Sequence, residues 1–218
     1  MSWPRKLLAV VAFLAMGVIF SPESFGSKSD GQISTKLATY LKLAYLLSFT
    51  TAFGAALWVT FPAVFIVPVT LFSLNLPRHL FGNLRSKLFP ASFILVGICC
   101  AISAASFGYL HPWKSSSTGE KFQLGLLLSS LAFNLSNLFL FAPMTIEMMK
   151  QRHKVERELS IGEEIGLSKN TEVAKVNTKL AAMNRKFRMI HGVASLAHIM
   201  FFVSLIMHSW YLAGKINL

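Results

Sequence analysis

Two histidines in the last long apolar stretch of the chain are the side chains best suited to chemistry. His191 and His198 stand seven residues apart, so on a helix they share one face. Imidazole is a good ligand for haem iron, copper or zinc. Two ligands that hold one ion from a single helix usually stand three or four residues apart, and the sequence has no Cys-x-x-Cys or His-x-x-x-His pair. We therefore expect no metal site and no cofactor, with haem or metal binding as an alternative.

Small and polar side chains recur at helical spacing in the other apolar stretches too. An amide or imidazole that faces lipid is costly, whereas one that faces another helix can form a hydrogen bond. Two interpretations stay open: hydrogen bonds between helices, or a path for a solute, ion or cofactor. The residues of this predicted polar interior are His198, His191, Asn134, Asn137 and Ser195. The first two stretches carry the similar sets Ser48, Thr51 and Ala55, and Cys99, Ser103 and Ser106.

Sequence patterns of catalysis are missing. The chain has no Gly-x-Ser-x-Gly, no phosphate-binding glycine loop and no His-Glu-x-x-His. No acidic residue lies in the core of an apolar stretch, because Glu120 and Glu147 stand at stretch ends. Transport coupled to a carboxylate inside the membrane is therefore disfavoured. We expect no catalytic residues and no enzymatic activity.

Composition indicates what kind of molecule positions these residues. Of the 218 residues, 54% are hydrophobic and 14% are charged, whereas soluble domains carry roughly 25% charged residues. The sequence therefore predicts an all-α integral membrane four-helix bundle that contacts the lipid bilayer. The expected spans are about 43–74, 88–110, 122–146 and 189–214. The first span is long, and we expect it to tilt or bend at Pro62 and Pro68.

The net charge of +12 indicates membrane topology first. No nucleic-acid-binding motif occurs, so we expect no nucleic acid partner. Thirteen Lys and Arg residues fall on one side of the predicted spans and six on the other, ten of the thirteen in the loop 147–188. The richer side should face the cytoplasm. Apolar residues recur in this loop every three or four positions and predict one face of a helix that continues into the fourth span, at Val173, Val176, Leu180, Met183, Phe187 and Ile190. We expect a cytoplasmic helical hairpin, through which protein partners could bind.

The start of the chain resembles a targeting segment. Arg5 and Lys6 precede an apolar run of 14 residues, and Ser24 and Gly26 fit a cleavage site. Residues 1–26 are therefore expected to be a signal peptide or an anchor helix, followed by a four-span domain at 27–218. Either reading gives the same orientation.

Two groups of basic residues lie where lipid head groups are expected. One group comprises Arg78, Arg85 and Lys87, and the other comprises Arg185, Lys186 and Arg188. The first group, with Phe81 and Phe89 interleaved, suits a head-group or docking surface. The alternative is that residues 78–90 are only the tight turn between the first two spans, with Pro90 in the first turn of the second span.

Several blocks of sequence resemble the transmembrane protein 205-like family, whose defining domain has no known function. The most specific block is Pro-Arg-His-Leu-Phe-Gly at 77–82, followed by Ser-Lys-Leu-Phe-Pro at 86–90. Further blocks lie at 54–61, 142–149, 187–196 and 210–214. The signal-like start is most similar to plant members. The resemblance implies a four-span bundle of endomembranes and supplies no reaction or cofactor. His198 departs from the family, which is expected to have Asn there.

The function expected from these features is that of a multi-pass membrane protein of the secretory or endomembrane system, or of the plasma membrane. It would act through membrane or protein contacts. One alternative is a small-solute or ion transporter that uses the polar interior, and another is a haem or metal-binding membrane protein.

Overall fold

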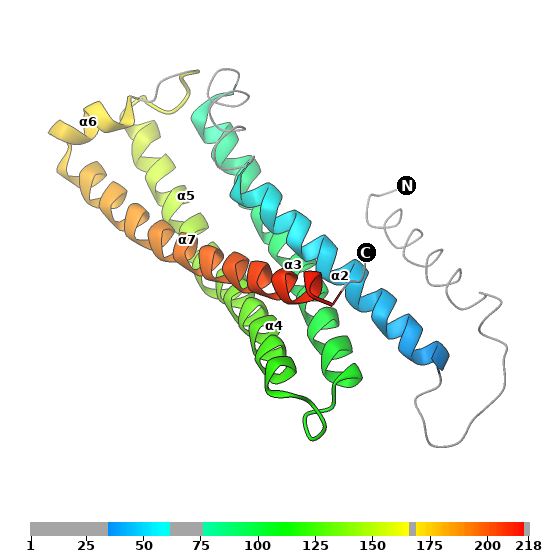
Figure 1. Cartoon of the computed structure of the whole chain (residues 1–218). Helices are drawn as coiled ribbons and strands as arrows, with labels where there is room; N and C mark the ends of the chain where they lie inside the picture. The colour runs from blue at the N-terminus through cyan, green and yellow to red at the C-terminus, as the bar shows by residue number, and fades with distance from the viewer. Residues whose placement is uncertain (1–34, 62–75, 166–168, 216–218) are drawn as a thin grey trace, which may run out of the picture.

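The chain forms an all-helical bundle over the residues that the computed structural model describes, which are 35–61, 76–165 and 169–215. The helices of Figure 1 are α2 (Thr35–Thr60), α3 (Arg78–Leu110), α4 (Thr118–Ser136), the π-helix η3 (Asn137–Phe141), α5 (Ala142–Glu158), α6 (Asn170–Val176) and α7 (Thr178–Ala213). Four helical segments are long and apolar enough to cross a membrane. The predicted all-α membrane bundle is confirmed. The expected signal peptide or anchor and the bend at Pro62 and Pro68 lie outside the described residues.

The spanning helices are longer than a bilayer needs. α3 has 33 residues and α7 has 36, which gives lengths of about 50 Å and about 54 Å at 1.5 Å per residue. The hydrocarbon core is only about 30 Å thick. The basic residues concentrate where α3 and α7 begin and where α5 ends, so these turns extend beyond the hydrocarbon. We call this part the Glu156 end, which lies at the top of Figure 1. The opposite part, where α3 ends and α4 begins, is the His208 end.

Residues 78–90 are helical, so the predicted tight turn is wrong. α3 begins at Arg78, directly after Pro77, and continues through Pro90 without interruption. The segment contains Leu, Arg and Lys, which favour helix. Pro77 marks the start of the helix, a role that we had assigned to Pro90. The second membrane-spanning helix therefore starts about ten residues before the apolar stretch does. The first and last membrane-spanning helices also begin earlier than expected: α2 begins at Thr35 and α7 begins at Thr178.

The third membrane-spanning helix changes its hydrogen-bond pattern in the middle. The N–H of Ala142 donates to the carbonyl of Asn137, an i to i+5 bond that defines the π-helix η3. Pro143 follows directly and has no N–H to donate, which explains why the regular pattern is interrupted here. α4, η3 and α5 nevertheless form one continuous segment from Thr118 to Glu158.

The predicted continuous helix from residue 173 into the fourth span is wrong at one point. α6 ends at Val176, and Asn177 caps a new helix by accepting a hydrogen bond from the N–H of Leu180 at 2.9 Å. Asn is among the best N-cap residues, so the break has a local cause. Val176 consequently turns outward and is 86% exposed. The rest of the hairpin packs as expected, with Leu180 buried against Val155 and Ile161.

Aromatic side chains dominate the core between the spans. Tyr45 of α2 contacts Phe107 of α3, and Phe202 of α7 packs on Phe53. The most buried face of α2 carries aromatic and alanine residues. Of the expected set, Ser48 and Ala55 are partly buried, whereas Thr51 is exposed and its hydroxyl donates to the carbonyl of Leu47. Large apolar side chains cover the outside of the bundle, as a lipid-facing surface requires.

Candidate functional site

A carboxylate with no solvent exposure lies at the centre of the Glu156 end. Glu156, in the last turn of α5, is 0% exposed. Its Oε1 lies 3.1 Å from Nη2 of Arg78 and 3.5 Å from Nε of Arg152. The Asn170 amide donates to the same oxygen at 2.5 Å, and Asn184 donates to Asn170 at 2.6 Å. One carboxylate therefore joins the ends of α3, α5, α6 and α7.

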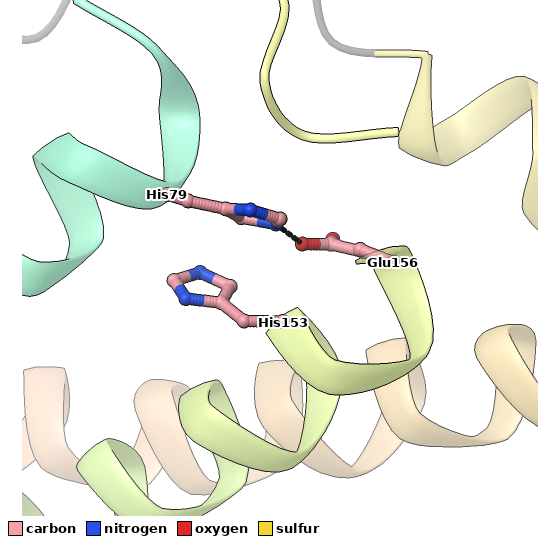
Figure 2. Close-up of side chains that lie close together, drawn as sticks. All are labelled: His79, His153 and Glu156. Atoms are coloured by element: carbon pink, nitrogen blue, oxygen red, sulfur yellow. Dashed lines mark hydrogen bonds and ion pairs between the residues drawn. The ribbon is translucent and has the colours of Figure 1, made fainter. Parts of the chain in front are cut away.

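One imidazole approaches the other oxygen of this carboxylate, and a second lies beside the first. Nε2 of His79 lies 2.8 Å from Oε2 of Glu156, and the His153 ring lies against His79 at a tilt of 40°, with ring centroids 4.3 Å apart (Figure 2). Both histidines are buried. Ligand atoms of His79, His153 and Glu156 all lie within 4.8 Å of one another. We call these three residues the His–His–Glu cluster.

Local sequence explains how the cluster is assembled. His153 and Glu156 are three residues apart on α5, so they share one face. His79 is the second residue of α3, and its N–H donates to the carbonyl of Gly162 at 3.2 Å. The chain turns after α5 at Ser160 and Gly162, which have φ of 54° and 100°. Gly162 thus both reverses the chain and holds the start of α3 against the end of α5.

Glycines also create the space that the imidazoles fill. A Cβ on Gly82 would lie 2.7 Å from Cε1 of His153, and a Cβ on Gly162 would lie 2.1 Å from Nε2 of His79. Real Cβ atoms do not approach so closely. Any other residue at either position would therefore displace a ring of the cluster.

The electrostatics of the cluster are uneven. Two guanidinium groups face Oε1 of Glu156, and the His79 imidazole faces Oε2. A neutral imidazole at His153 carries a lone pair on one of its ring nitrogens. Two imidazoles and a carboxylate are a typical donor set for divalent zinc and its neighbours.

A hollow of about 380 Å³ opens beside the cluster. Arg152, Lys175 and Arg188 line it together with the amides of Asn170 and Asn184, and among the described residues no acidic side chain contributes to its wall. The guanidinium of Arg152 also lies over the Phe187 ring, 4.2 Å from its centroid. The residues of the hollow precede position 189, where the sequence predicted the fourth span to begin.

A second polar network lies at the His208 end. His208 is fully buried. Its Nε2 forms a hydrogen bond with the Tyr45 hydroxyl, and its Nδ1 lies 2.9 Å from Oε1 of Gln123. Phe49 and Phe107 pack around its ring. A hollow of about 430 Å³ lies above Tyr45, with Lys42, Glu120 and Lys215 in its wall. The network joins α2, α4 and α7 with neutral groups alone.

The predicted polar interior is divided by the structure. Asn134 is buried and donates to the carbonyl of Phe93 at 2.9 Å, and Asn137 is buried at the start of the π-helix. His198 is partly buried and lies 3.1 Å from the Thr60 hydroxyl. Ser195 is partly buried, whereas His191 is exposed and stacks on Phe187. In the described part of the chain no hydrogen bond between side chains joins any two of these five residues, and whether they form one path stays a prediction.

The predicted head-group residues also have different positions. Arg78 turns inward to Glu156, and Arg85 lies between the rings of Phe81 and Phe89. Lys87, Arg185 and Lys186 are exposed, and Arg188 lines the hollow. Sequence reasoning missed the buried groups Glu156, His79, His153 and His208. The His-x-x-Glu spacing at 153–156, and the His in the Pro-Arg-His block, were the available signals.

Comparison with known proteins extends over most of this architecture. Residues 47–154 match the family described as Domain of unknown function (DUF4149). Transmembrane protein 205 of Danio rerio is 28% identical over 178 residues, which cover 80% of this chain and 92% of that relative. No solved structure matches the chain. Four apolar helices and these two similarities agree: the chain belongs to the transmembrane protein 205-like family of multi-pass membrane proteins.

Proposed function

We propose that this protein is a non-catalytic membrane protein of the secretory or endomembrane system, and that its Glu156 end faces the cytoplasm and binds phosphate-bearing head groups of anionic lipids. The observation that carries the proposal is the hollow of about 380 Å³ whose charged walls are all basic. The excess of Lys and Arg on this side supports the orientation. The signal-like start supports entry into the secretory pathway.

The hollow suits a phosphate group in charge and in hydrogen-bond chemistry. Arg152, Lys175 and Arg188 supply positive charge, and Asn170 and Asn184 supply amide groups. Charge-assisted hydrogen bonds from guanidinium groups to phosphate are among the strong ones. Its volume lies within the usual range of small-molecule sites.

The rigidity of the surroundings supports binding as well. Arg152 is held between Glu156 and the Phe187 ring, and Asn184 is held by Asn170. Side chains that are already ordered lose little conformational entropy when a ligand binds. The hollow therefore differs from a group of solvated surface lysines, because two of its polar side chains, Arg152 and Asn184, are held by neighbouring buried residues.

The proposal is tested by measuring how tightly the purified full-length protein binds an anionic lipid and a zwitterionic lipid. Native mass spectrometry during titration with phosphatidylinositol 4-phosphate or phosphatidylcholine gives an affinity for each lipid. The double variant Lys175→Gln/Arg188→Gln should bind the anionic lipid about tenfold or more weakly, since each basic residue near a head group contributes about 1 kcal/mol. The matched control Arg185→Gln/Lys186→Gln removes the same charge outside the hollow and should stay within about twofold of wild type.

Three results would contradict the proposal. Equal retention of phosphatidylcholine would remove the role of the phosphate charge. Equal weakening by the two double variants would assign binding to diffuse surface charge. Competition by inorganic phosphate at the concentration of the lipid would assign the hollow to a free anion.

A further inference from the structure

We propose that His79, His153 and Glu156 form a binding site for one divalent transition-metal ion of the zinc type. This site is distinct from the basic hollow and does not depend on the proposed lipid function. The three residues come from two helices, α3 and α5, and Figure 2 shows the His79 ring turned toward the carboxylate and the His153 ring beside His79. Ligand atoms around zinc lie about 2.0–2.2 Å from the ion. The present mutual separations, all within 4.8 Å, need only small side-chain rotations to reach that geometry.

The arrangement of His153 is the strongest observation in favour of a ligand. The ring is 7% exposed, and within the described residues no hydrogen bond or ion pair to either of its nitrogens is found; its contact with His79 is a ring contact. The fully buried nitrogen without a hydrogen-bond partner in this cluster is Nδ1 of His79. The nitrogens of His153 are not fully buried, so an ion can reach a lone pair that no other described group uses.

The surroundings of His79 resemble those of a metal-bound histidine. Its Nε2 faces Oε2 of Glu156 at 2.8 Å, and its buried Nδ1 lies 3.6 Å from a carboxylate oxygen of Glu163. Histidines that bind metal through one nitrogen commonly direct the other nitrogen at a carboxylate or carbonyl, which fixes the ring orientation. Glu163 is exposed and would supply this outer contact without entering the site.

The two arginines beside Glu156 do not block the site. Both guanidinium groups and the Asn170 amide lie at Oε1, and the His79 imidazole lies at Oε2. The carboxylate can therefore hold the arginines with one oxygen and an ion with the other. On binding, the ion takes the place of the hydrogen atom between His79 and Glu156. From a neutral His79 that proton moves to Nδ1, which faces Glu163, and from an imidazolium it leaves to solvent while Nδ1 keeps its own proton. Water would complete the coordination, because three protein ligands leave a position open.

The test uses the full-length protein in detergent, purified without a histidine tag and stripped of metal with a chelator. Calorimetric titration with ZnCl₂ should show about one ion per chain, and His153→Gln should weaken binding by about 100-fold or more. The matched control His191→Gln removes an exposed histidine of α7 and should bind as wild type does. Circular dichroism and thermal unfolding establish that each variant is folded.

X-ray absorption of the zinc-loaded wild type keeps the inference testable if the variants fold poorly. It should show a first shell of nitrogen and oxygen only, with outer scattering from two imidazoles. Absence of zinc binding by the wild type would overturn the proposal, as would equal binding by folded His153→Gln. A first shell with one imidazole or none would overturn it too.

Discussion

The two buried polar networks of this protein differ in charge, and the difference follows the membrane. At the Glu156 end a carboxylate is surrounded by Arg78, Arg152 and His79. At the His208 end a tyrosine, a histidine and a glutamine satisfy one another without a formal charge. A buried charge costs several kcal/mol unless it is paired, and the cost is highest in hydrocarbon. The charged network therefore occupies helix turns beyond the lipid, and the neutral one lies among the aromatic residues of the spans.

Removing the charge of Glu156 should have the largest effect on stability. Glu156→Gln keeps the shape of the side chain but leaves two arginines and a histidine without their carboxylate. Breaking a buried ion pair costs about 3–5 kcal/mol, so the free energy of unfolding in detergent should fall by about 3 kcal/mol or more.

The matched control for this prediction is Glu158→Gln, two residues further along on the same segment and exposed. It should change the unfolding free energy by less than about 0.5 kcal/mol. Equal effects of the two substitutions would mean that the buried carboxylate does not hold the four helix ends together.

Loss of the neutral network should have a smaller effect. His208→Leu preserves an apolar side chain of similar size and removes the hydrogen bonds to Tyr45 and Gln123. Hydrogen bonds between membrane helices average about 0.6 kcal/mol and reach about 2 kcal/mol, so we expect a loss of about 1–2 kcal/mol in the same unfolding assay. His191→Leu, at an exposed histidine, is the control and should be close to neutral. A loss from His208→Leu as large as that from Glu156→Gln would remove the contrast between the two ends.

Local patterns predicted the spans well and predicted the sites poorly. Apolar length identified the membrane helices, and the spacing of Asn134 and Asn137 identified a face that is buried. The apolar stretch did not mark the helix ends, because α3 and α7 extend past the lipid into polar sequence. This is why a turn at residues 78–90 stayed open as an alternative and why the cap at Asn177 was not expected to divide the hairpin.

The His–His–Glu cluster could not be derived from spacing alone. His79 and Glu156 are 77 residues apart in sequence, and only the packing of α3 against α5 brings them together. His208 had the same limitation, since Tyr45 and Gln123 come from other helices. His191 and His198 attracted attention because they share a face, yet the fully buried histidine of α7 is His208, ten residues beyond His198.

The most direct test of this account asks whether the Glu156 end stands in cytoplasmic water. Single cysteines at Lys154, which is exposed on α5, and at Ile98, which is exposed on the spanning part of α3, are placed in a chain whose Cys99 and Cys100 are alanine. A membrane-impermeant maleimide is then added to sealed vesicles with the cytoplasmic face outside. We expect Lys154→Cys to be labelled and Ile98→Cys to be protected. Labelling at position 98, or protection of position 154 in the sealed vesicles, would contradict the account.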